Sequence, residues 1–210
     1  MLGEDSGVYV GIDPSISNTG VVVLSAYDGK PVEGVNGGIA CKSKKFSCDI
    51  QRYSAQADYI ASKLDAYDVK GVAYENYSYN SVHKAFSIAE YNGILKRALL
   101  EIGHGQDILL VAPATNKKFA TGHGTADKHM MIEQALVEGL TASGLDCHKL
   151  TDDICDAYFL ARMAFYVFDV DGAISADANL NANIDIKTRV DVTRKLREAR
   201  DAQHNALHHG

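Results

Sequence analysis

The sequence predicts an α/β fold in which a mixed five-stranded sheet is flanked by helices. Three short apolar segments come first, at residues 8–12, 21–24 and 36–40, and polar turns separate them as in antiparallel strands. Two more apolar segments, at 71–74 and 108–112, alternate with longer stretches of helical periodicity. Strands that alternate with helices enter a sheet by crossover connections, so the later two strands are expected to make the sheet mixed.

Helical periodicity marks the segments between and after the later strands. In the first of them apolar residues recur every three or four positions, and Ser47 is the expected N-cap. We therefore expect one α/β domain over residues 1–170. Residues 171–210 are expected to be a linker (171–186) followed by a basic C-terminal helix. The expected helices lie at about residues 48–66, 83–102, 127–140, 152–168 and 188–206.

Composition limits the classes of function. With 46% hydrophobic and 23% charged residues, the chain has the composition of a soluble globular protein. No apolar stretch approaches the roughly 20 residues that span a bilayer, and the short acidic N-terminus is unlike a signal peptide. A cytoplasmic location is expected, nucleoid-associated or in the host cytoplasm for a viral protein, with no membrane partner. The formal charge of -6 disfavours a generic nucleic-acid binder, although lysines cluster locally.

The C-terminal helix carries one such cluster, with six basic and three acidic residues between Lys187 and Asp201. Two interpretations are open. The helix either binds DNA phosphates, or it docks on the protein core through Val192, Leu196 and Ala199.

Four carboxylates are predicted to meet at one edge of the sheet. Asp13 ends the first strand and Glu75 ends the fourth. Asp153 and Asp156 share a helix face three residues apart, although acids in a first helical turn are also ordinary and Thr151 or Asp152 would serve as the cap. Ionised carboxylates crowded together repel one another, and divalent cations relieve the repulsion.

An oxygen-only ligand set favours Mg²⁺ or Mn²⁺. Two such ions about 3.5–4 Å apart would suit phosphoryl displacement.

Four short motifs surround these acids: Gly11-Ile12-Asp13-Pro14 with Thr19-Gly20, Tyr74-Glu75, Gly122-His123-Gly124-Thr125-Ala126-Asp127-Lys128, and Asp153-x-x-Asp156-Ala157. In this order and near these spacings they resemble the RuvC-type Holliday junction resolvases of the RNase H-like nuclease superfamily. The resemblance spans roughly residues 8–168. It implies an RNase H-like sheet and a metal-dependent, structure-selective endonuclease that cleaves branched DNA, foremost four-way Holliday junctions, in recombination and repair.

The resemblance also implies roles for particular residues. Asp13, Glu75, Asp153 and Asp156 would be catalytic acids that bind two Mg²⁺ or Mn²⁺ ions, with Asp152 as a competitor for the position of Asp153. Lys117 and Lys128 would be the basic catalytic residues near the scissile phosphate, which they would neutralise as positive point charges. The DNA-binding candidates are Tyr77, Tyr79, Lys117, Lys118 and Lys128, because aromatic rings stack on unpaired bases and lysines neutralise phosphates.

A homodimer is the expected assembly. In the family the helix after the Glu75 loop forms the dimer interface, and here residues 83–102 are apolar over a wide arc, as in a helix packed on two sides. The chain departs from cellular members of the family in being acidic and in carrying some forty residues beyond the last motif. Both departures point to a divergent or phage-type member.

Three other functions are alternatives. A non-catalytic DNA-binding relative would be expected to lose one or more acids, yet all four are present. Cleavage of RNA–DNA hybrids by an RNase H-like relative is an intermediate option, between a junction endonuclease and a non-catalytic relative. An ATPase of the actin-like fold also opens on an Asp-rimmed hairpin but needs a second phosphate hairpin, which this sequence does not show.

Overall fold

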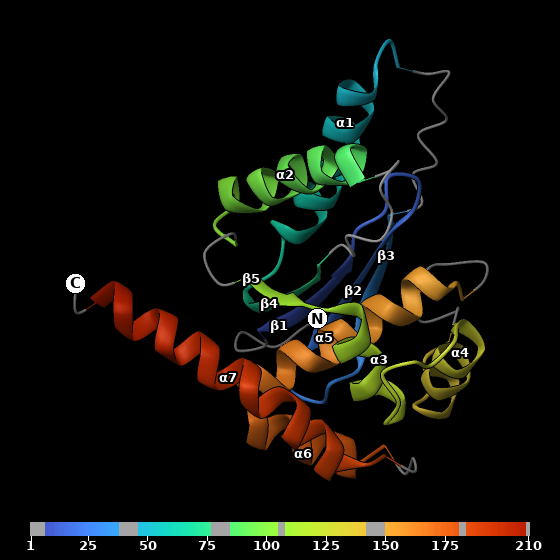
Figure 1. Ribbon diagram of the computed structural model, residues 1–210, viewed down its shortest axis with the longest axis vertical. Coiled ribbons are helices and arrows are strands. Elements are labelled where there is room, and N and C mark those ends of the chain that lie inside the picture. Colours follow the sequence, from blue (N-terminus) through green and yellow to red (C-terminus); the bar gives the residue numbers. More distant parts are fainter. Residues whose placement is uncertain are drawn as a thin grey trace.

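A five-stranded mixed sheet with the strand order β3-β2-β1-β4-β5 forms the centre of the protein (Figure 1). The computed structural model describes residues 7–37, 46–76, 85–104, 108–141, 150–180 and 184–208. The strands are β1 (Val8–Asp13), β2 (Thr19–Ser25), β3 (Pro31–Gly37), β4 (Val69–Glu75) and β5 (Ile108–Val111).

The pairing of the strands confirms the predicted mixed sheet. Strands β1, β2 and β3 form two antiparallel hairpins. Strand β4 pairs parallel with β1, and β5 pairs parallel with β4. Both parallel strands follow a helix, as crossover connections require.

Helices cover both faces of the sheet (Figure 1). Helices α1 (Asp49–Leu64) and α2 (Ala85–Glu101) pack on one face, where Val10 and Ile12 of β1 are fully buried. On the other face α5 (Asp152–Phe168) crosses the sheet, and the ring of Tyr9 stacks on Phe165 with 4.7 Å between centroids. Alternate residues of β1 thus serve two separate cores. Helix α5 is surrounded by α3 (Pro113–Thr121), α4 (Lys128–Val137), α6 (Val170–Ala178) and α7 (Ile186–His208).

Two glycines set how closely α5 approaches the sheet. A Cβ atom on Gly11 would lie 2.0 Å from the carbonyl oxygen of Ala157, and one on Gly20 would lie 2.1 Å from that of Asp153. Such distances do not occur between real atoms, so only glycine permits this contact. The first turns of α5 therefore rest directly on β1 and β2.

Several expected boundaries were wrong. The third strand is Pro31–Gly37 and not 36–40, of which 38–40 lie outside the described residues. Ser47 does not cap α1: the N-cap is Cys48, and the Ser47 hydroxyl donates to the Gln51 side chain at 2.7 Å. Pro113, expected only to end a strand, also begins helix α3 at a position where proline is favoured.

The expected linker was also wrong, because its first half is helix α6. Ala173 and Ala176 on this helix are fully or almost fully buried against the core around α5. The sequence suggested a linker because the segment is rich in Ala, Asp and Asn, but its alanines pack on the hydrophobic surface of α5.

Helix α7 docks on the core, as one of the two interpretations required. Val192 and Leu196 pack against the hydrophobic cluster around α5, whereas Ala199 is exposed. Several of its basic residues bind the protein itself: Arg197, for example, donates to the Tyr166 carbonyl and Arg200 to the Val167 carbonyl, each at 2.9 Å.

These two carbonyls belong to the last turn of α5, where positive charge complements the helix dipole. None of the helices in the described part of the chain is long and apolar enough to cross a membrane.

Candidate active site

The sheet brings two of the predicted acids to one edge. Asp13 is the last residue of β1 and Glu75 the last of β4, and these strands are parallel neighbours. Ile12 is paired with Tyr74, so the residues that follow them lie side by side. Both side chains are partly buried. Sequence position alone was enough to predict this pair because the carboxyl ends of parallel strands share an edge.

Helix α5 adds the other two acids. Its N-cap is Thr151, whose hydroxyl accepts a hydrogen bond from the Ile154 amide at 3.4 Å. Asp153 and Asp156 follow within the first two turns and are partly buried. Because the Asp153 backbone lies against β2 at Gly20, the start of α5 is held at the end of the first hairpin. The cap is therefore Thr151, and Asp152 remains available for other contacts.

The four carboxylates lie close enough to disturb one another. Burial raises the pKa of Asp13 well above its ordinary value, and the charges of Glu75, Asp156 and Asp153 raise it further. Burial also raises the pKa of Asp153, while a hydrogen bond from Asn18 opposes the shift. Perturbed pKa values of this kind are frequent in functional sites.

The pKa values of Glu75 and Asp156 are also raised by burial, and the charge of a lysine partly opposes this rise. Burial, followed by the charge of Asp156, raises the pKa of Glu75 to about 7, and a hydrogen bond from Asn116 and the charge of Lys117 oppose this. Burial raises the pKa of Asp156 to about 6, against the charge of Lys117. Within the described part of the chain, the site therefore holds more negative charge than its lysines neutralise.

The predicted lysines differ in their surroundings. Lys117 on α3 is partly buried and acts electrostatically on both Glu75 and Asp156. Lys128, the first residue of α4, forms an ion pair with Asp152, and that pair lowers the pKa of Asp152. Lys118 is exposed. Asp152 is thus neutralised within the chain, unlike Asp153. Tyr77 and Tyr79 lie outside the described residues.

Two asparagines in the site were missed by sequence reasoning. Asn18, in the turn after β1, donates to the Asp153 carboxylate at 2.7 Å. Asn116 on α3 is fully buried, donates to the Asp156 carbonyl at 3.1 Å and hydrogen-bonds Glu75. A signal for Asn116 was present, because it shares the buried face of α3 with Phe119 and Ala120. A polar residue on such a face needs a partner.

The turn that follows Asp13 is held from the opposite face of the sheet. The Thr19 hydroxyl shares a hydrogen bond of 2.6 Å with Tyr91 on α2 and accepts one of 2.9 Å from Gln56 on α1. Gln56 also reaches the Ser15 carbonyl at 3.3 Å. Helices α1 and α2 thereby fix the loop between Asp13 and Asn18, although they carry none of the acids.

The donor set of the site fits a hard divalent cation. All four acids offer oxygen, and one oxygen of the Asp156 carboxylate is buried without a hydrogen-bond partner. Among the described residues no group of three or more His, Cys, Asp and Glu side chains has the spacing of a formed metal site. The carboxylates are therefore close neighbours that influence one another, not a closed ligand cage.

A mixed sheet in this order, with acids at the ends of its first and fourth strands and an acid-bearing helix across one face, is the RNase H-like fold. Solved structures that share it include the following two. One is T. thermophilus RuvC in complex with Holliday junction substrate, with a TM-score of 0.52, 20% identity, and coverage of 81% of this chain and 97% of that chain. The other is a Thermus thermophilus RuvC structure, with a TM-score of 0.50 and 22% identity over 83% of this chain.

Whereas the solved structures show the fold, sequence comparison identifies the family. The model of the family described as crossover junction endodeoxyribonuclease RuvC matches residues 9–162. Proteins of that name from Gloeobacter violaceus and Corynebacterium jeikeium are each 28% identical to this chain, over 75% and 58% of its length and 87% and 74% of theirs. The chain belongs to the RuvC family of crossover junction endodeoxyribonucleases.

Proposed function

We propose that this protein is an endonuclease that resolves four-way Holliday junctions, with Asp13, Glu75, Asp153 and Asp156 as its metal-binding catalytic acids. The observation that carries this proposal is the excess of negative charge where β1, β4 and α5 meet. The family match supports the reaction, and the likeness to a RuvC bound to a Holliday junction supports the substrate. A non-catalytic relative has no reason to keep this charge excess, and family membership leaves an actin-like ATPase without support.

Metal dependence follows from the chemistry of the donors. We infer that the four acids hold two Mg²⁺ or Mn²⁺ ions, which would supply charge neutralisation and an activated water for phosphodiester hydrolysis. Asp153 is favoured over Asp152 as the fourth ligand, because Asp152 is already paired with Lys128 whereas Asp153 has a raised pKa. The Asn18 amide orients Asp153, since it binds one carboxylate oxygen at 2.7 Å.

The lysines would act on the DNA as point charges. Lys117 is placed to neutralise a phosphate beside Glu75 and Asp156, since its charge already reaches both. Lys128 stands at the start of α4 beside Asp152, at the border of the same site. Lys118 is exposed on α3 and would contact the DNA backbone further from the acids than Lys117 does. Tyr77 and Tyr79 follow Glu75 in the chain and remain candidates for stacking on bases at the junction.

A symmetric dimer would match the two-fold symmetry of a four-way junction. Helix α2 supports this assembly because it is apolar on two sides. Tyr91 and Leu95 are buried against the sheet and α1. Phe86, which is 81% exposed, and Leu100, which is 54% exposed, lie on the other side, and a Cβ atom on Gly93 would meet nothing within 4 Å. Light scattering at micromolar concentration, with and without junction DNA, tests this, and a monomer in both would contradict paired cleavage.

One panel of substrates tests the proposed function. Purified protein with Mg²⁺ is incubated with a four-way junction and with matched duplex, fork, flap and RNA–DNA hybrid. The proposal predicts paired cuts in the junction, no comparable cutting of the duplex, and loss of cutting in EDTA. Preferred cutting of the hybrid would replace the proposal with an RNase H-like activity. Binding of the junction without cutting, in Mg²⁺ and in Mn²⁺, would leave a non-catalytic DNA-binding relative.

A further inference from the structure

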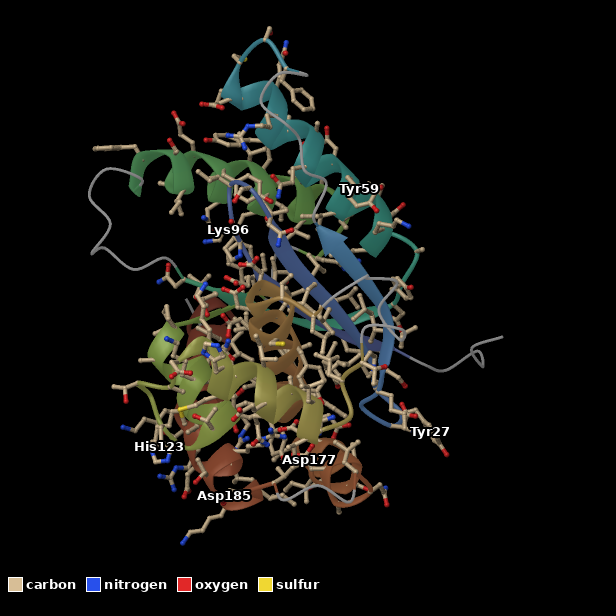
Figure 2. All side chains as sticks on the ribbon, turned by 90° about the vertical axis from the view of Figure 1, so that its right-hand side faces the viewer. Tyr27, Tyr59, Lys96, His123, Asp177 and Asp185 are labelled. Atoms are coloured by element: carbon tan, nitrogen blue, oxygen red, sulfur yellow. The ribbon has the colours of Figure 1, made fainter. Side chains whose placement is uncertain are left out.

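A second cluster of charges is buried away from the sheet edge, beneath the helices of the α5 face. It consists of Arg162 on α5, Asp177 on α6, Arg189 on α7 and Glu138 just after α4, which we call the buried ion network. All four residues are 0–3% exposed. Figure 2 shows Asp177 where α6 meets the other helices on this side. Two positive and two negative charges balance, as buried ions require.

Arg189 is the member that reaches furthest. One of its terminal nitrogens binds the Asp177 carboxylate at 2.8 Å and the other forms an ion pair with Glu138. Its guanidinium also lies over the ring of Phe119, 4.8 Å from the centroid. An arginine can make these three contacts together because its head is planar and carries a fork of donors. A single side chain of α7 thus holds α3, α6 and the end of α4.

Helices α3 and α4 are the elements that carry the proposed site lysines. Phe119 is on the buried face of α3, two residues after Lys117 and three after Asn116. Glu138 directly follows the last turn of the helix that begins at Lys128. The contacts of Arg189 therefore hold both helices through buried residues, Phe119 on α3 and Glu138 after α4, and not through the lysines themselves.

Helix α7 is not part of the matched family region. That region ends at residue 162, whereas Arg189 lies 27 residues beyond it. The common part of the family therefore does not contain this support for α3 and α4. In this chain, Arg189 of the additional helix α7 supports α3 and α4, the helices that carry the proposed site lysines.

We propose that Arg189 is a positioning residue for cleavage, which holds α3 and α4 so that Lys117 and Lys128 face the acids. The proposal rests on the proposed role of these lysines. Arg189 does not touch the reacting groups itself. Its loss should change the rate of cleavage more than the affinity for the junction, because most phosphate contacts would survive a small shift of two helices.

The test uses a variant that keeps the buried charges balanced. Arg189→Met alone would leave Glu138 and Asp177 facing one cation, so it is combined with Glu138→Gln, which leaves the Arg162–Asp177 pair intact. Single-turnover cleavage of a four-way junction in Mg²⁺ is compared with the dissociation constant in EDTA. A fall of at least tenfold in rate, with affinity within threefold and a melting temperature above the assay temperature, is expected. A normal rate in this folded variant would overturn the proposal.

A double-mutant cycle separates positioning from general loss of stability. Lys117→Met is made in the wild type and in the Arg189→Met, Glu138→Gln background. If Arg189 acts through α3, loss of Lys117 costs at least fivefold less in the variant than in the wild type, because its position is already lost. Equal costs in both backgrounds would overturn the proposal. If Lys117→Met cuts at the normal rate in the wild type, it is the proposed role of Lys117 that fails.

Two further variants guard the result. Phe119→Leu keeps every ion pair and removes only the ring under the guanidinium, so a folded protein with a rate reduced several-fold supports the contact to α3. An unchanged rate would count against it. Arg194→Met removes an arginine from the solvent side of the same helix, where the side chain is 60% exposed. It should cleave within twofold of the wild type, and a loss equal to that of the Arg189 variant would overturn the assignment.

Discussion

The two clusters of buried charge in this protein differ in balance. In the buried ion network two arginines face two carboxylates, and Tyr158 and Tyr166 donate further hydrogen bonds. At the sheet edge, among the described residues, four carboxylates meet the partly buried Lys117, the more distant charge of Lys128 and two asparagine amides. A cluster that serves stability pairs its charges within the chain. An unbalanced one indicates a partner from outside the chain, and we propose metal ions and a phosphodiester as the partners here.

The largest expected effect comes from neutralising an acid of the unbalanced cluster. Asp13→Asn removes one proposed metal ligand and one repelling charge, so cleavage should fall on the order of 10³-fold or more, while junction affinity is retained. Glu75→Gln and Asp156→Asn should behave alike. The measurement is single-turnover cleavage beside binding by fluorescence anisotropy. Asp58, which is exposed, provides the control variant Asp58→Asn. Near-normal cutting by the Asp13, Glu75 or Asp156 variant would remove that acid from the site.

The balanced cluster should respond in the opposite way. Of the residues that the structure describes, Asp177→Asn leaves Arg162 and Arg189 buried with Glu138 as their one counter-charge. The free energy of unfolding should fall by about 3–5 kcal/mol, because an uncompensated charge stays buried. Urea unfolding of both proteins measures this change. Asp13→Asn should leave stability equal or higher, since it relieves repulsion, and a comparable loss in both variants would remove the contrast between the clusters.

Dependence on pH sharpens the comparison further. The folded-state pKa is about 7 for Glu75 and about 6 for Asp156, both above the ordinary carboxyl range. The folded protein therefore binds protons that the unfolded chain releases, and stability from these groups is lost as pH rises through about 5 to 7.

Without divalent metal, the melting temperature should thus be lower at pH 8 than at pH 5.5, with a change in stability on the order of 2 kcal/mol. Added Mg²⁺ should restore stability at pH 8. The Asp156→Asn variant should show a smaller pH effect, and an unchanged pH profile in that variant would contradict the origin assigned to it.

The smallest effect is expected at Asn116, which links the Glu75 side chain to the backbone of Asp156. Asn116→Ala should lower the cleavage rate roughly tenfold, about 1.4 kcal/mol in the activation barrier. Affinity should stay within threefold, because Asn116 is fully buried and does not face DNA. Asn116→Asp provides the opposing variant, since a fifth carboxylate should be worse than alanine. A rate above that of alanine would exclude the role of a neutral donor.

The sequence predicted those parts of the structure that depend on local order. Asp13 and Glu75 each end an apolar segment, so their meeting at one edge followed from strand direction alone. Asp153 and Asp156 followed from helical spacing, and the motifs identified the family. Helix α3 was missed because its short sequence after Pro113 has little apolar periodicity, and α6 was missed because alanines that pack on α5 look like linker residues.

Contacts between distant segments were beyond sequence reasoning. Arg189 lies 51 residues from Glu138 and 12 from Asp177, and nothing near it distinguishes it from the solvent-facing arginines of the same helix. Asn18 and Asp153 are 135 residues apart. Their pairing depends on Gly20, which lets α5 rest on the hairpin. The basic helix was therefore open to two interpretations until its packing against α5 was known. The division of the chain at residue 170 remains a prediction.

The central claim is that the unbalanced cluster is a metal site, and Mn²⁺ binding tests it most directly. Free Mn²⁺ is followed by electron paramagnetic resonance while the wild-type protein or Asp13→Asn is titrated in without DNA. We expect the wild type to bind Mn²⁺ and so to lower the signal of free Mn²⁺ through a class of sites that Asp13→Asn lacks. Added Mg²⁺ should compete for these sites and restore the signal. Identical binding curves for the two proteins would contradict it.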